Sequence, residues 1–99
     1  LSRDGYDHVE VTRGSRDQGV DVLAQRDGVS YAVQCKHYTA KIPNKAVQEA
    51  YAGAEFYGCD VPVVVTNSWF TPSAKELADE IGVELWDRDE LNRLVRRTK

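Results

Sequence analysis

An excess of positive charge, methionine and long apolar segments are all missing from this sequence of 99 residues. Lys and Arg number 13 against 16 Asp and Glu, which gives a formal net charge of −3. A freestanding nucleic-acid binder usually carries an excess of basic residues, so binding to DNA or RNA would need a local basic patch or a separate binding domain. No apolar run approaches the ~20 residues of a membrane span, and we expect no membrane partner.

Cysteine is also scarce, and the two cysteines, Cys35 and Cys59, do not have the spacing of metal ligands. We interpret both as reduced thiols and expect a cytoplasmic protein. Because there is no methionine to initiate translation, we expect the sequence to be a fragment of a longer chain. The hydrophobic share of 41% suits one modest core, and the length predicts a single domain over residues 1–99.

The pattern of apolar residues predicts three strands followed by helices that alternate with further strands. Alternating or continuous apolar runs predict the strands, and apolar residues at helical spacing predict the helices. We expect strands at 8–13, 20–26, 29–36, 61–66 and 83–86, and helices at 45–57, at 72–81 and around Leu91, Leu94 and Val95. This order predicts an α/β fold, with a mixed sheet and helices on its faces.

The expected helix ends carry recognisable capping residues. Asn44 precedes the first of these helices, whose inward stripe we expect to comprise Val47, Ala50, Tyr51 and Ala54. Thr71 precedes a first-turn proline in the second helix, and Gly58 and Gly82 terminate the two helices. The segment Asp87–Glu90 resembles a capping box for the last helix.

A two-residue turn, Asp27-Gly28, separates two of the predicted strands and fixes their register. With Arg26 opposite Val29, paired residue numbers sum to 55, which sets Asp21 opposite Gln34. Lys36 lies two residues beyond Gln34, on the same face of the strand. The opposite face is then expected to form the core through five residues: Val20, Val22, Tyr31, Val33 and Cys35.

One face of this hairpin would therefore collect a carboxylate, an amide and an ammonium group within roughly 5 to 7 Å. Asp21, the Gln34 carbonyl and the backbone carbonyl of Cys35 offer oxygen ligands of the kind that Mg²⁺ prefers. Lys36 could orient an attacking water or stabilise charge on a phosphate, so the cluster suits hydrolysis of a phosphodiester bond. The residues alone also fit a structural Asp–Lys pair beside an uninvolved glutamine, and a bulge at Gly19 would break the register.

Four segments resemble the Mrr-like restriction endonuclease catalytic domain, a branch of the PD-(D/E)xK nuclease superfamily. They are G-S-R-D-Q-G-V-D-V-L-A-Q, Y-A-V-Q-C-K-H-Y, V-V-V-T-N-S-W-F-T-P-S-A-K-E-L-A and I-G-V-E-L-W-D-R-D-E-L-N-R-L. They occur in the family's order, and the resemblance covers about residues 5 to 95.

The resemblance implies a three-layer α/β/α restriction-endonuclease-like fold with a central mixed β-sheet. It implies Mg²⁺-dependent cleavage of DNA, with Asp21 as the metal-binding acid, Gln34 in place of the second acid and Lys36 as the catalytic lysine. Asp17 is a weaker candidate, and Gly19 would allow a sharp approach to the strand. It also implies restriction of foreign or modified DNA and a separate DNA-recognition domain in the full-length protein.

This sequence departs from the family at its start, where residues 1–6 look like only the tail of the expected N-terminal helix. We therefore expect that helix to be truncated, which leaves open a further metal ligand from it. The choice between Mg²⁺ and Mn²⁺, and whether two copies form a homodimer that cuts both strands, are also open.

Other polar and aromatic residues are weaker candidates. His37 could touch a phosphate, and Gln48 could face the site from the first helix, although a solvated surface position is the stronger interpretation of each. Trp69 and Phe70 could stack on a base, but packing beneath the following helix is favoured over stacking.

Three alternatives to a restriction nuclease keep the same residues. The first is a DNA repair or junction-resolving nuclease, which junction-selective cutting would indicate. The second is a catalytically silent nuclease-like module that binds without cleaving. The third is a domain whose short N-terminal part forms an interface with an obligate partner.

Overall fold

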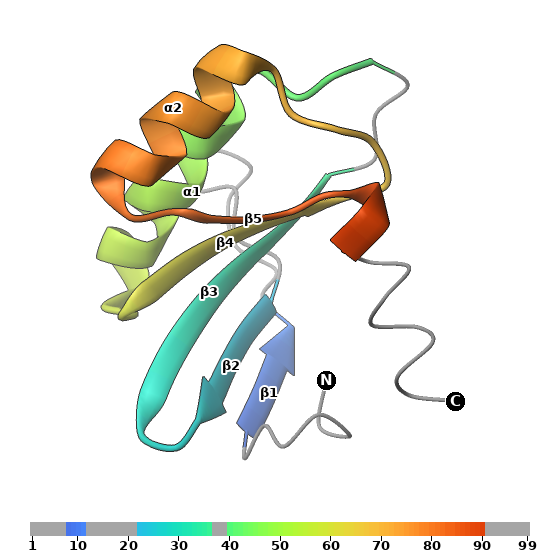
Figure 1. Cartoon of the computed structure of the whole chain (residues 1–99). Coiled ribbons are helices and arrows are strands. Elements are labelled where there is room, and N and C mark those ends of the chain that lie inside the picture. The colour runs from blue at the N-terminus through green and yellow to red at the C-terminus, as the bar shows by residue number, and fades with distance from the viewer. Residues whose placement is uncertain (1–7, 12–21, 37–39, 91–99) are drawn as a thin grey trace.

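The structure, a computed structural model, describes residues 8–11, 22–36 and 40–90. Within these residues, five strands and two helices follow one another in the predicted order, with three strands first (Figure 1). The elements are β1 (His8–Val11), β2 (Val22–Arg26), β3 (Val29–Lys36), α1 (Asn44–Tyr57), β4 (Val61–Thr66), α2 (Pro72–Ile81) and β5 (Glu84–Trp86). The predicted α/β fold with a mixed sheet is confirmed.

The strands lie side by side in sequence order, β1-β2-β3-β4-β5. The first three are antiparallel, and the two-residue turn at 27–28 reverses the chain between β2 and β3. Strands β3, β4 and β5 are parallel because a helix carries the chain back each time. Strand β3 therefore has an antiparallel neighbour on one side and a parallel neighbour on the other.

The predicted hairpin register is confirmed over the whole described ladder. Arg26 pairs with Val29 at the turn, and the pairing continues to Val22 opposite Val33. Asp27 and Gly28 both have positive φ, 53° and 82°, as a two-residue turn with the twist of the flanking strands requires. Asp21 lies outside the described residues.

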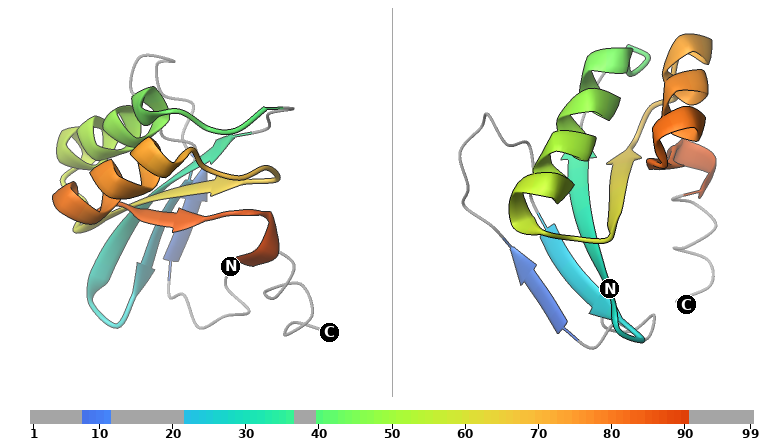
Figure 2. Two further views of the ribbon diagram at one scale, coloured as in Figure 1. Left: turned by 45° about the horizontal axis from the view of Figure 1, so that its top comes forward. Right: turned by 90° about the vertical axis from the view of Figure 1, so that its left-hand side faces the viewer.

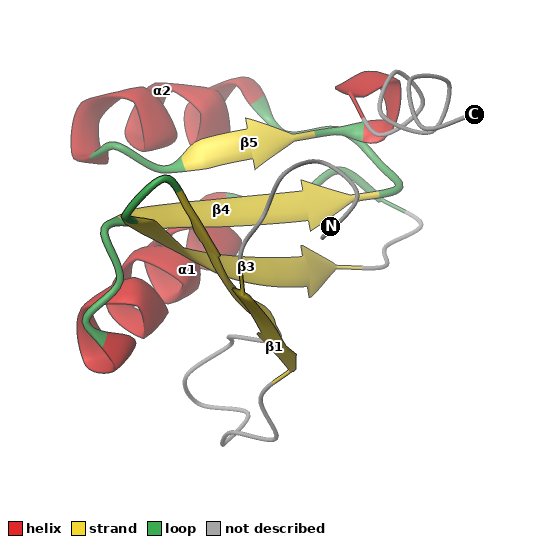
Figure 3. Cartoon of the chain, turned by 90° about the horizontal axis from the view of Figure 1, so that it is seen from below, coloured by secondary structure: helices red, strands yellow, loops and turns green. Residues whose placement is uncertain are grey.

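Both helices cover the same face of the sheet (Figures 2 and 3). Each connects two neighbouring parallel strands, and successive right-handed crossovers that run in one direction across a sheet keep their helices on one side. The expected N-terminal helix tail falls outside the described residues. Residues 88–90 are helical, and Glu90 N donates to Asp87 Oδ1 at 3.0 Å, so the cap predicted for the last helix is present. Its expected apolar residues lie outside the described part.

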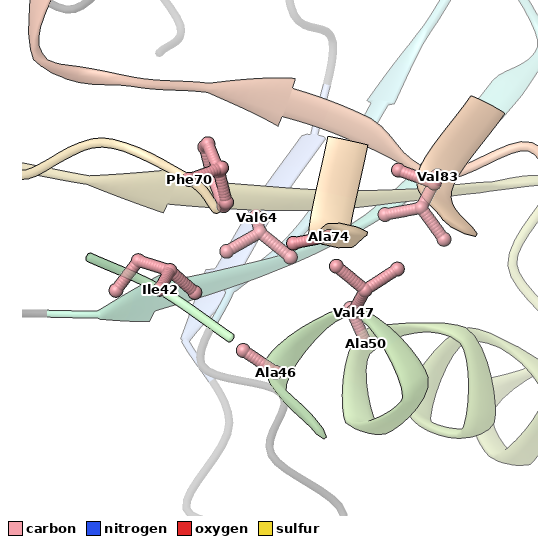
Figure 4. Packing of buried hydrophobic residues seen from close by; sticks show 9 residues of the cluster. Ile42, Ala46, Val47, Ala50, Val64, Phe70, Ala74 and Val83 are labelled. Carbon is pink, nitrogen blue, oxygen red and sulfur yellow. The ribbon is translucent and has the colours of Figure 1, made fainter. Parts of the chain in front are cut away.

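The core lies between this helical layer and the sheet (Figure 4). Its largest members include Ile42, Val47, Val64 and Phe70, and the helices contribute mainly alanines, namely Ala46, Ala50, Ala74 and Ala78. Small side chains bring the helix backbones close to the strands, so side chains on β3 and α1 can reach each other across the layer.

Three predicted helix boundaries are confirmed, and the predicted N-cap of α1 is wrong. Thr71 Oγ1 accepts from Ala74 N at 3.0 Å, and Gly58 and Gly82 end the helices with φ of 67° and 78°. Asn44 is not the cap of α1, because the extended backbone of Pro43 precedes the first turn and makes no side-chain cap bond. Asn44 is instead the first helical residue, and its Nδ2 donates to Ser73 Oγ at 2.9 Å.

The prediction of which hairpin face forms the core is wrong in part. Val33 is buried, but Tyr31 and Val22 are only partly buried and Cys35 is exposed. The helices cover the other face of β3, the face of Ala32 and Gln34, so that face forms the main core. Val20 lies outside the described residues.

Candidate active site

Gln34 and Lys36 are two residues apart at the end of β3, so their side chains point to the same face of the sheet, toward α1. The side chain of Gln34 is buried, with the residue only 2% exposed. Both residues lie in the parallel ladder with β4, so the backbone of β3 holds these two side chains on a rigid support. The predicted shared orientation of Gln34 and Lys36 is present.

The structure adds a carboxylate that the sequence patterns did not reveal. Glu49 lies in the second turn of α1, and its Oε1 accepts from Lys36 Nζ at 3.1 Å and from Gln34 Nε2 at 3.5 Å. The Lys36 and Glu49 side chains are only 20% and 30% exposed. Partial burial reduces screening by water, so this ion pair orients both side chains more firmly than a surface pair would.

The other amide atom of Gln34 has an unusual environment. In the part of the chain that the structure describes, Gln34 Oε1 is buried and has no hydrogen-bond donor. Turning the amide over would place this oxygen against the Glu49 carboxylate, so the orientation with Nε2 toward Glu49 is the favourable one. A buried acceptor without a donor costs about 1–3 kcal/mol. Such a cost is commonly retained where the atom serves a ligand or a reaction.

The side-chain oxygen atoms of Gln34 and Glu49 fit a hard divalent cation such as Mg²⁺. The buried Gln34 Oε1 is a neutral oxygen, and the neighbouring carboxylate of Glu49 carries negative charge; both are ligand types that Mg²⁺ accepts. Among the described residues no three His, Cys, Asp or Glu side chains gather closely enough to hold a metal by themselves. The predicted acid, Asp21, falls outside this part of the chain.

None of the remaining predicted site residues within the described ranges joins this cluster through its side chain. Cys35 is exposed, and only its backbone carbonyl was expected to act as a ligand. Gln48 is exposed on α1, beside Glu49 in sequence, and has no place in the Gln34–Lys36–Glu49 cluster. Asp17, Gly19 and His37 lie outside the described residues.

The edge of the sheet where β3 ends is held together by short polar contacts. Thr66 pairs with Lys36 in the parallel register and is buried, and its Oγ1 accepts from Ser68 N at 3.1 Å. Ser68 Oγ donates to the Ala40 carbonyl at 2.8 Å, which links the loop after β4 to the loop before α1. These two hydrogen bonds hold the loop after β4 beside the end of β3.

The two aromatic residues beyond this turn differ in their surroundings. Phe70 is buried in the core, as the packing interpretation predicts. Trp69 is 42% exposed, and the Arg88 guanidinium lies 5.6 Å from the centre of its ring. A cation at this distance is attracted to the ring face, so Arg88, which follows β5, lies against Trp69 in the loop after β4.

Hydrogen bonding and burial shift two pKa values at the opposite end of β3. The Ser30 backbone N–H and then its hydroxyl donate to Asp60 and hold the pKa of that carboxyl below its ordinary value. Burial raises the pKa of the neighbouring Cys59 thiol. Both groups lie at the start of β4, away from Lys36, so they belong to the scaffold rather than to the site.

Glu49 could have been found from the phase of α1. Ala46 and Gly53, three residues before it and four after it, are both buried, which sets Glu49 beside the inward stripe of the helix. Including Tyr51 in that stripe rotated the expected inward face away from Glu49. Tyr51 is in fact 42% exposed, so that part of the helix prediction is wrong.

Comparison with known proteins shows the family and the fold of the chain. The family model described as a restriction endonuclease, the Mrr catalytic domain, matches residues 1–95. An uncharacterized protein of Archaeoglobus fulgidus is 31% identical over 74 residues, which cover 70% of this chain and 42% of that protein. A crystal structure of a protein of unknown function is similar with a TM-score of 0.75 and 26% identity, covering 88% of this chain and 52% of the other.

The chain thus spans about half the length of these relatives or less. The family match, in contrast, extends over nearly all of its residues. The chain belongs to the Mrr restriction endonuclease family and has the fold of a nuclease domain.

Proposed function

We propose that this chain is the catalytic domain of a metal-dependent DNA endonuclease that hydrolyses phosphodiester bonds. The observation that supports it best is the pairing of a buried amide and an oriented lysine, Gln34 and Lys36, on the helix-covered face of β3. One further step of the hairpin register would add Asp21 opposite Gln34. Family membership supports the same reaction class.

Asp21, Gln34 and the Cys35 backbone carbonyl are the proposed ligands of the ion, Mg²⁺ or Mn²⁺. A divalent ion at such a site supplies positive charge that polarises a phosphate and assists the formation of a nucleophile from water. The buried Oε1 of Gln34, which has no donor among residues 8–11, 22–36 and 40–90, supports this assignment, because a cation would satisfy it.

Lys36 would act on the substrate directly. Its ammonium group can donate to a non-bridging phosphate oxygen and stabilise the charge that develops there in the transition state. The contact with Glu49 limits where the Lys36 Nζ can lie, so less conformational freedom is lost when a phosphate binds.

The DNA context belongs to the same proposal. The chain covers about half of the length of its relatives or less. We therefore assign three features to the full-length protein: a separate DNA-recognition domain, a homodimer, and a role in restriction of foreign or modified DNA. The exposed Trp69–Arg88 pair offers one cationic group beside an aromatic ring, which could contact a phosphate and a base. Among the described residues neither cysteine forms a disulfide, which supports a cytoplasmic location. None of the helices within the described ranges is long and apolar enough to cross a membrane.

Cleavage of supercoiled plasmid is the test of this proposal. We expect nicking with Mg²⁺ or Mn²⁺, none with EDTA, and loss of nicking in Asp21→Ala and in Lys36→Ala while the circular dichroism spectrum stays unchanged. These residues would act on metal and phosphate, so their removal should lower the rate by at least about a hundredfold. Nicking by either variant at the parent rate would contradict the site assignment.

The substrate distinguishes the alternatives. Preferential cutting of a four-way junction over linear duplex would favour a junction-resolving nuclease. Binding of DNA without cleavage by the full-length protein, on both modified and unmodified DNA, would favour a silent binding module and would overturn the proposed enzyme.

A further inference from the structure

We propose that Glu49 is a second carboxylate ligand of the metal site, supplied by α1 because β3 carries the neutral Gln34 where a second acid would otherwise stand. This inference rests on the proposed function and deepens it. The ligand is a divalent cation that prefers oxygen, of the class of Mg²⁺ and Mn²⁺.

The charges at the site favour this role. With Asp21 as the sole acid, its carboxylate and the Lys36 ammonium would cancel, and a divalent cation would enter a neutral site. The Glu49 carboxylate, which already contacts both Gln34 and Lys36, brings the set of ionised side chains to a net negative charge. Cation affinity rises with the number of charged ligands, so the site gains binding strength from α1.

The burial pattern points the same way. Gln34 is buried, and its Oε1 has no donor among the described residues, while its Nε2 is directed at Glu49. The Gln34 oxygen, which needs a positive partner, therefore belongs to a side chain that contacts the Glu49 carboxylate. Purely structural packing would be served better by an apolar residue in place of Gln34, because this would remove the unsatisfied acceptor.

Lys36 would then have two positions in the reaction cycle. In one, its Nζ lies 3.1 Å from Glu49 Oε1 and neutralises that carboxylate. In the other, with Glu49 neutralised by a bound divalent cation, Lys36 would be available to a phosphate. A carboxylate has about four lone-pair sites, so it can bind a cation and still accept from an ammonium group while this exchange takes place.

The test measures Mn²⁺ binding to the protein without DNA, through the electron paramagnetic resonance signal of free Mn²⁺. We expect Glu49→Gln to weaken Mn²⁺ binding by at least about tenfold, as the loss of a metal ligand should. Glu55→Gln is the matched control, because it removes the same charge from an exposed position of α1 that has no part in the cluster. We expect its affinity for Mn²⁺ to equal that of the parent.

A second measurement covers the case in which Glu49→Gln does not fold. Anomalous scattering from Mn²⁺ in crystals of the unaltered protein locates the ion directly, and coordination by a Glu49 oxygen would support the proposal. An ion bound by other residues, with Glu49 still paired to Lys36, would overturn it. Equal losses of affinity in Glu49→Gln and Glu55→Gln would overturn it as well, because the effect would then be one of general charge.

The failure of this inference can be distinguished from the failure of the proposed function. If Mn²⁺ binding and nicking depend on Asp21 but not on Glu49, the role of Glu49 is refuted and the nuclease assignment stands. If the full-length protein binds Mn²⁺ through Glu49 but never cuts DNA, the metal site is upheld and the proposed reaction is refuted.

Discussion

At the scale of single residues, Gln34 shows how function and stability can compete at one position. Its amide is buried beneath α1, and one of its two polar atoms is left without a partner among the described residues. A residue selected for stability alone would be apolar at such a place. The polar side chain is therefore best understood through the site rather than through the core.

Replacing Gln34 by leucine should separate the two properties. The side chains are similar in size, so we expect Gln34→Leu to change the free energy of unfolding by less than about 1 kcal/mol, or to raise it, because the unsatisfied oxygen disappears. Nicking of plasmid should be lost. Urea denaturation and the plasmid assay measure the two effects, and Gln48→Ala, at an exposed position, should alter neither. A variant that keeps nicking would show that the Gln34 amide has no catalytic part.

Asp60 gives a pH-dependent prediction at the same scale. The hydrogen bonds from Ser30 lower the pKa of Asp60 from its ordinary value of 3.8, so its ionised form stabilises the folded state. That contribution is present above about pH 4 and is lost as the pH falls through the lowered pKa. We expect Asp60→Asn to be less stable than the parent at pH 7, and the difference to shrink in acid. Urea denaturation at a series of pH values tests this, and a constant difference would contradict it.

At the scale of the element, helix ends provide a direct contrast between a real cap and a false one. Thr71 caps α2 through its side chain, so Thr71→Ala should lower the free energy of unfolding by about 1 kcal/mol. Asn44 only contacts Ser73 at the surface, so Asn44→Ala should cost less than about 0.5 kcal/mol. Urea denaturation of both variants provides the measurement. Equal losses would mean that the Asn44 contact, rather than capping, controls these helices.

The elements also show what the sequence could predict and what it could not. The bounds of β3 and β4, the register of the Asp27-Gly28 turn and the cap at Thr71 follow from local patterns, and all are confirmed. The role of Asn44 was wrong because a proline before a helix can stand at its N-cap without a side-chain bond.

The candidate site was less predictable than the strands. Alternation along β3 set Gln34 and Lys36 on one face, but it could not tell which face the helices would cover. Glu49 is 13 residues from Lys36 in sequence, and only the packing of α1 on the sheet brings the two together. Whether Asp21 lies beside them stays a prediction from the register.

At the scale of the whole molecule, Ile42 connects the loops at the edge of the sheet beside Lys36. Its side chain is fully buried, its N–H donates to the Trp69 carbonyl at 2.7 Å, and its carbonyl accepts from Thr71 N at 3.0 Å. We expect Ile42→Ala to lower the free energy of unfolding by about 2–5 kcal/mol, as removal of a large buried side chain does. Val9→Ala, at an exposed position on β1, should change it by less than about 0.5 kcal/mol. Denaturation by urea distinguishes the two, and a small effect at Ile42 would mean that the core can collapse around the missing atoms.

The positive-φ residues described above have a consequence for how this domain could acquire new specificities. Asp27, Gly28, Gly58 and Gly82 all lie at the rim where β3, β4 and β5 begin, and each turn there depends on a left-handed backbone. Inserted residues at that rim would have to rebuild the turn. The segments before α1 and after β4 lie at the opposite rim, beside Lys36, where the described residues have no left-handed conformation. Longer loops can therefore be grafted next to the chemistry while the turns that hold the sheet in register stay untouched.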